Sequence, residues 1–231
     1  MKHMRHIVAR AGAMWIIAGI NAALFIAACC GVHLSALWLG AGSDALLSRP
    51  WSVVTYMFAQ TQPAHFAVNI IGLIITGAWF QTRMSGLQLT ATYLAGGLAG
   101  ALAFETAALM AGTPDATLAG SSASVLAVYA AIVAAHGRML DKVSLGTAGR
   151  WSPGWPLCLI AISSVFELWG ANPGGNLAHL AGIAAGCLIG RYRSHSRRTA
   201  GSDNSDIIEK FERSGYSGLN AAERNRLSKP S

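Results

Sequence analysis

The sequence is poor in charged side chains: Asp, Glu, Lys and Arg make up 12% of its 231 residues, whereas 53% are hydrophobic. This balance, with a positive mean hydropathy, excludes an ordinary soluble globular protein and places the chain in the membrane class. Acidic residues are scarcer than basic ones, 10 against 17, which gives a formal net charge of +7. What that excess means depends on where the basic residues fall.

Three further absences narrow the class of protein. The four cysteines lie within or at the ends of apolar runs and show no Cys-x-x-Cys spacing, so we interpret them as packed thiols and expect no disulfide, metal site or cofactor. The apolar runs lack the strict alternation of barrel strands. No small-x-small cleavage site follows the basic segment 1–10, so we expect an uncleaved first helix.

The chain does contain six apolar runs long enough to cross a bilayer as helices. They fall at about residues 11–32, 64–80, 87–111, 116–135, 155–169 and 175–190. Backbone polar groups in lipid must be satisfied within their own segment, which a helix does. The sequence therefore predicts an all-α membrane protein with a bundle of six transmembrane helices.

The distribution of Lys and Arg predicts the orientation of this bundle. If the N-terminus is cytoplasmic, the stretches on that side carry eleven Lys and Arg residues up to residue 198, and the outer loops carry only Arg49. The positive-inside rule then places both termini in the cytoplasm. The net charge reports this topology and contact with anionic lipid, and nucleic acid is not an expected partner.

Three regions flank or interrupt the predicted bundle, which occupies residues 11–192. Residues 1–10 form a basic cytoplasmic N-terminus. A long outer loop at about 33–63 has mixed polarity, and we expect it to lie in the membrane interface with Trp38 and Trp51 as anchors. Residues 193–231 are predicted to be a flexible cytoplasmic linker and a small helical tail, in which Asn220 and Glu223 have capping-box spacing.

Polar side chains inside apolar helices are costly, so their depth is informative. Asn69, Ser122 and His179 lie about 21, 24 and 18 Å from the first cytoplasmic Arg beside each helix, at a rise of about 1.5 Å per residue. All three therefore lie in one layer, nearer the outer surface. His65 lies one turn farther out on the same face as Asn69, and we expect Glu105 to reach the headgroups.

Small residues indicate that these helices pack closely. The last run carries small residues at every fourth position, beginning at Ala178, and His179 borders this stripe. The alternative that such glycines serve helix packing alone stays open for most of them. The glycines that concern the candidate site are Gly120, Gly182 and Gly186, with a further cluster at Gly96, Gly97 and Gly100.

A serine beside a histidine in one layer indicates acyl-transfer chemistry. A serine hydroxyl needs a base to take its proton as it attacks a carbonyl, and His179 in its neutral form can do this for Ser122. The last run contains no Asp or Glu, so the expected unit is a dyad and not a triad. The Ser122 N–H, Asn69 and His65 are candidate donors to an oxyanion.

Other interpretations remain open at this point. A module that holds transmembrane clients without cutting them would lack the Ser or the His, and both are present. A small transporter or channel would be expected to show an inverted repeat, which does not appear. Ser121 or Ser124 could be the nucleophile, but each points about 100° or more away from Ser122 around the helix.

The motifs RPWSVVTYMF, HFAVNIIGL, LAGGLAGAL, GSSASVLAVYAA and NLAHLAGIAAGCLIG, in this order, resemble the rhomboid family of intramembrane serine proteases over about residues 15–192. The resemblance implies a Ser122 nucleophile, a His179 base, and an oxyanion hole completed by His65 and Asn69. It implies single-pass transmembrane substrates cut near their outer end. The tail is similar to a short extension on rhomboids of Bacteroidota, which implies a bacterial inner membrane.

The chain departs from the family pattern at three positions. Ala123 replaces the last glycine of Gly-x-Ser-Gly, Gln60 stands where a second loop histidine is frequent, and Leu126 stands where some members place a Tyr against the catalytic His. These departures concern rate and fine geometry, because the dyad itself is retained.

Overall fold

The computed structural model describes residues 2–60, 62–81, 84–140, 154–166, 168 and 172–227. The connection between the fourth and fifth predicted spans, and the end of the fifth, lie outside the described residues. The chain divides into two compact units, Met1–Gly190 and Arg191–Ser231, and each is described by itself.

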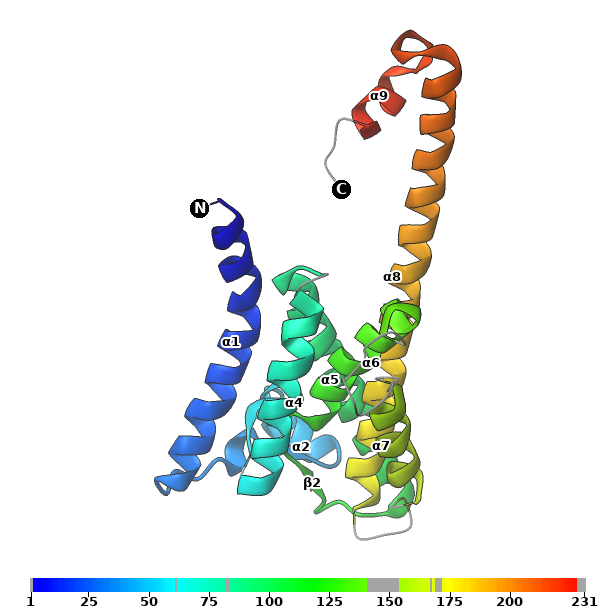
Figure 1. The fold of residues 1–231 in the computed structure, drawn as a ribbon. Helices are drawn as coiled ribbons and strands as arrows, with labels where there is room; N and C mark the ends of the chain where they lie inside the picture. Colours follow the sequence, from blue (N-terminus) through cyan, green and yellow to red (C-terminus); the bar gives the residue numbers. More distant parts are fainter. Residues whose placement is uncertain are drawn as a thin grey trace, which may run out of the picture. The chain divides into compact units, whose positions relative to one another are not determined.

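Helices form most of the described residues of the first unit, and each of the six longest helices that the structure describes overlaps a predicted apolar run (Figure 1). Their bounds are α1 Lys2–Cys29, α4 Pro63–Gln81, α5 Gly86–Ala111, α6 Ser122–Leu140, α7 Gly154–Phe166 and α8 Pro173–Ser214. Within the described residues, Gly12–Cys29 and Gly86–Ala111 are long and apolar enough to cross a membrane, and α4, α6 and α7 contain shorter apolar segments.

The start of α6 differs from the prediction that its run begins as helix near residue 116. Thr117–Leu118 instead form the short strand β2, which pairs antiparallel with β1, Leu39–Gly40, so the all-α prediction is wrong for this small sheet. Gly120 then adopts a φ of 127°, a backbone conformation that favours glycine. The helix therefore begins only at Ser122.

The outer loop is folded through much of its length, with η1 Ser35–Leu37, α2 Ser43–Ser48, α3 Ser52–Thr55 and η2 Tyr56–Phe58. Glu105 of α5 accepts a hydrogen bond of 2.9 Å from the backbone N–H of Gly42. Its carboxylate therefore holds this loop, and the expectation that Glu105 reaches the headgroups stays a prediction. Trp51 is exposed and its indole donates to the Ala36 carbonyl, which orients it at the surface.

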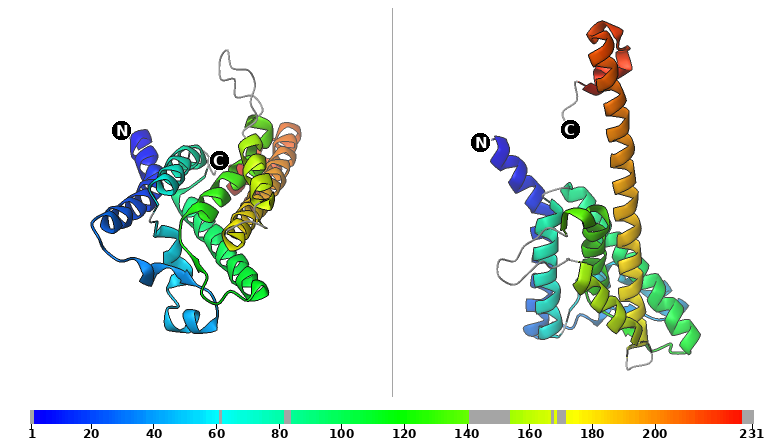
Figure 2. Two further views of the ribbon diagram at one scale, coloured as in Figure 1. Left: turned by 90° about the horizontal axis from the view of Figure 1, so that it is seen from below. Right: turned by 45° about the vertical axis from the view of Figure 1, so that its right-hand side comes forward.

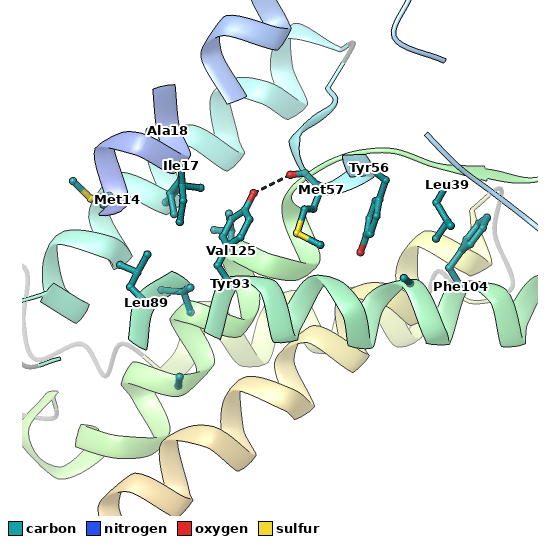
Figure 3. Close-up of a cluster of buried hydrophobic side chains, with 14 of the residues drawn as sticks. Met14, Ile17, Ala18, Leu39, Tyr56, Met57, Leu89, Tyr93, Phe104 and Val125 are labelled. Carbon is teal, nitrogen blue, oxygen red and sulfur yellow. Dashed lines mark hydrogen bonds between the residues drawn. The ribbon is translucent and has the colours of Figure 1, made fainter. Parts of the chain in front are cut away.

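Figure 3 shows the core, where the loop packs on α1, α5 and α6. Tyr93 of α5 donates to the Met57 carbonyl at 2.8 Å, and Tyr56 donates to the Gly97 carbonyl at 2.6 Å. Beside this core some polar side chains are buried and some large apolar ones are exposed: Gln60 and Asn69 are buried, whereas Leu102 of α5 is 72% exposed. Large apolar side chains on the outside and amides on the inside are typical of a membrane protein.

The second unit holds the end of α8, η5 Tyr216–Gly218 and α9 Ala221–Leu227. The predicted capping box is confirmed, since Asn220 and Glu223 bond to each other's backbone N–H. The bonds from Asn220 and from Lys210 hold the pKa of Glu223 below its usual range. The predicted flexible linker is wrong: α8 continues to Ser214, because the segment contains no proline that would end a helix already begun.

Candidate active site

Ser122 and His179 face each other across the interface of α6 and α8. Ser122 is the first residue of α6, and His179 lies in the second turn of α8. The Ser122 Oγ is 2.8 Å from the Nε2 of His179, within the range expected of a nucleophile and its base. The predicted proximity of the two side chains is confirmed, although the residues are 57 positions apart in the chain.

The two other serines of this segment, Ser121 before α6 and Ser124 within it, point elsewhere. Ser121 accepts a hydrogen bond of 3.1 Å from Gln60, and the Ser124 hydroxyl lies 3.7 Å from the sulfur of Met57. Both side chains are buried, whereas Ser122 retains partial exposure. Of the three serines considered in the sequence, Ser122 is therefore the one that meets His179 and remains open to a substrate.

Close packing of α6 against α8 brings the pair together. A Cβ built on Gly182 or on Gly186 would fall against the backbone carbonyl of Ala123 or Ala127, so only glycine permits this approach. A Cβ on Gly100 of α5 would likewise lie 2.8 Å from that of Ala123. The small-residue stripe of the last run is confirmed as a helix contact, and α6 packs against glycines of both α5 and α8.

Gly120 has a different role from the helix packing predicted for it, because it lies in the turn before α6. A Cβ there would lie 2.9 Å from the His65 ring, and the positive φ already favours glycine. The turn thus lets His65 of α4 approach the start of α6. The N–H of Ser122 follows this turn directly and, as a first-turn amide, has no acceptor within its own helix. Both this N–H and the His65 ring therefore lie beside the turn at Gly120.

Asn69 is tied into a buried amide network. Its Nδ2 donates to the Oε1 of Gln60 at 2.7 Å, and Gln60 in turn donates to Asn21 at 2.9 Å and to Ser121. Asn21 also bonds to the Tyr93 hydroxyl at 3.4 Å. An amide nitrogen carries two hydrogens, so the bond to Gln60 leaves Asn69 the capacity for a second acceptor.

Two residues near the dyad were not assigned a role from the sequence. Gln60 departs from a histidine that is frequent in the family pattern, yet its side chain joins α1, α4 and Ser121, the residue before α6. Ser164 of α7 lies 3.4 Å from the Nδ1 of His179, a contact that the sequence does not predict. No spacing within the chain relates it to His179, because the contact arises only when α7 packs beside α8.

The comparison with protein families covers the residues of this site. The model of the rhomboid domain matches residues 47–196, more than half of the chain, and this range contains the dyad, the α4 residues and Ser164. The matched range starts at residue 47, later than the resemblance inferred from the motifs, which starts at about residue 15. The matched range therefore leaves out α1. A search of curated proteins finds no match.

Proposed function

The chain belongs to the rhomboid family of intramembrane proteases, and from this premise we propose that it is an active serine endopeptidase that cleaves transmembrane segments. The observation that carries the proposal is the 2.8 Å contact between Ser122 Oγ and His179 Nε2. It pairs a nucleophile with a base at a helix start, where free backbone amides can stabilise negative charge.

The reaction proceeds through an acyl-enzyme. The Ser122 oxygen attacks the carbonyl carbon of the substrate while its proton passes to His179 Nε2, which then protonates the leaving amine. Water attacks the resulting ester with His179 again as the base, and the serine is regenerated. The N–H of Ser122, the second hydrogen of Asn69 and the His65 ring stabilise the oxyanion.

The same proposal includes the membrane topology. All six long helices cross the bilayer with both termini in the cytoplasm, as the Lys and Arg distribution predicts. The dyad then lies nearer the outer face, at a depth that water from that side can reach. A substrate helix must unwind there, because a helical peptide bond shields its carbonyl, so single-pass proteins with helix-breaking residues near their outer end are the expected substrates.

The test uses the full-length protein in liposomes with tagged single-pass substrates and mass spectrometry of the fragments. We expect a cut near the outer membrane edge that is abolished by Ser122→Ala and by His179→Ala. Asn69→Ala should slow cleavage about 10²-fold, the usual cost of one oxyanion donor. Ser124→Ala is the matched serine control and should retain activity.

Two results would contradict this assignment. A product that survives Ser122→Ala would move the nucleophile elsewhere. Folded wild-type protein that cuts none of the substrates, yet binds them, would favour a catalytically silent rhomboid that holds transmembrane clients.

A further inference from the structure

Ser164 of α7 touches the side of the histidine ring that the dyad does not use. Its Oγ lies 3.4 Å from His179 Nδ1, and the serine is only 2% exposed. We propose that Ser164 is a positioning residue that holds the Nδ1–H of His179 and so fixes the tautomer and orientation of the base; this inference rests on the proposed function.

The direction of this hydrogen bond follows from the other ring nitrogen. For Ser122 to lose its proton to His179, Nε2 must be the unprotonated nitrogen of a neutral imidazole. The single ring proton is then on Nδ1 and points at the Ser164 oxygen, which accepts it. Hydroxyls from two different helices therefore bracket one imidazole, the first as donor to Nε2 and the second as acceptor from Nδ1.

A hydroxyl suits this position within a membrane. In a soluble triad a carboxylate accepts the Nδ1–H, but an ionised carboxylate inside apolar helices is costly. Ser164 accepts the same proton without a formal charge. When His179 becomes an imidazolium during acylation, the bond from Nδ1 becomes charge-assisted and shortens, so a contact of 3.4 Å in the resting protein tightens as the reaction proceeds.

Packing of α7 on α6 and α8 places Ser164 next to the ring. Leu157 of α7 is buried in a cluster with Leu126 and Ala130 of α6, and Ile160 of α7 and Ile183 of α8 are among the side chains that pack against it. Leu126, the position where some rhomboids place a Tyr against the histidine, is here an aliphatic side chain that packs on α7. Support for the base comes instead from Ser164, at the other end of the same helix contact.

The neighbouring residue provides a matched control. Ser163 precedes Ser164 in the same helix, but its side chain is exposed and its hydroxyl donates to the Ile160 carbonyl at 3.0 Å. Ser163→Ala and Ser164→Ala remove the same atom from adjacent positions of α7. A difference between the two variants therefore reports the contact with His179 and not the loss of a hydroxyl from the helix.

The experiment measures cleavage kinetics and the ¹⁵N chemical shifts of His179 in the full-length protein. We expect Ser164→Ala to lower kcat about tenfold, the effect of one neutral hydrogen bond, with little change in KM, and to increase the fraction of the Nε2-protonated tautomer. Ser164→Thr, which keeps the acceptor oxygen, should restore both properties, and Ser163→Ala should change neither.

Equal kcat values and identical tautomer populations in Ser164→Ala and Ser163→Ala would overturn the proposal, as would a Ser164→Thr variant that is folded but resembles Ser164→Ala. The nitrogen shifts need no substrate, so the two proposals fail separately. If the wild-type protein cuts no substrate, the proposed function is refuted. If the Nδ1-protonated tautomer of His179 is nevertheless less populated in Ser164→Ala than in the wild type, the contact is still supported.

Discussion

Helix α6 is held differently on its two flanks. Towards α5 and α8 it presents alanines to glycines, and backbone meets backbone, as at Ala127 and Gly186. Towards α7 it presents Leu126 and Ala130 to the branched side chains of Leu157 and Ile160, and Figure 2 shows α6, α7 and α8 side by side. The first contact is fixed by hard backbone atoms, whereas the second depends on side chains that can adopt other rotamers.

The distances at the histidine follow this difference. Its bond to Ser122 of α6 crosses the glycine contact and measures 2.8 Å. Its bond to Ser164 joins α8 to α7, a helix held by the side-chain cluster around Leu157, and measures 3.4 Å. Backbone packing therefore sets the reactive distance, and side-chain packing sets the supporting one. Disturbing the first contact should affect activity more than disturbing the second.

Gly186→Val should have the largest effect. The new side chain would meet the Ala127 carbonyl and force α8 away from α6, which displaces His179 from Ser122. A displacement of about 1 Å can cost about 10²-fold in rate, so we expect cleavage to fall by at least that factor. Gly19→Val is the matched control, because Gly19 of α1 has open space around its Cβ position; a similar loss in both variants would contradict the argument.

Leu157→Ala should have a smaller effect. It opens a cavity between α7 and α6 and loosens the support of Ser164, but it leaves the glycine contact intact. We expect a lower thermal midpoint in detergent and a loss of activity of no more than about tenfold, comparable to that of one hydrogen bond. Leu159, which is 58% exposed on the same helix, provides the control; if Leu157→Ala were as damaging as Gly186→Val, the proposed ranking would be wrong.

The sequence predicts the features of this site that follow from the length of the apolar runs and from the depth of polar residues within them. Each predicted apolar run overlaps a helix of the described residues. Counting residues from the basic ends predicts that Ser122 and His179 lie at one depth, and their side chains are in contact. The contacts of Gln60 and Ser164 could not be predicted in this way. Gln60 lies in a loop, where no helical period relates it to Asn21 or Ser121.

Hydropathy predicts two helix ends wrongly, the start of α6 and the end of α8. The run from 116 is apolar enough for a helix, yet β2 forms there because Gly120 turns the chain and because the loop offers β1 as a partner. The segment after 193 is polar enough for a linker, yet it continues α8, since polar residues disfavour a helix only weakly once it has been nucleated. Hydropathy reports burial and depth, and it does not mark where a helix stops.

The contact between Gly100 and Ala123 has a consequence for how such sequences can change. Ala123 is the departure from the usual Gly-x-Ser-Gly, and its methyl group is 3% exposed in the space that Gly100 leaves by having no side chain. That space holds one methyl group, so it can be contributed by α5 or by α6 but not by both. We therefore expect the two positions to be epistatic: an alanine at 100 would crowd both Ala123 and the Tyr56 hydroxyl, and a glycine at 123 would remove the first of these two contacts.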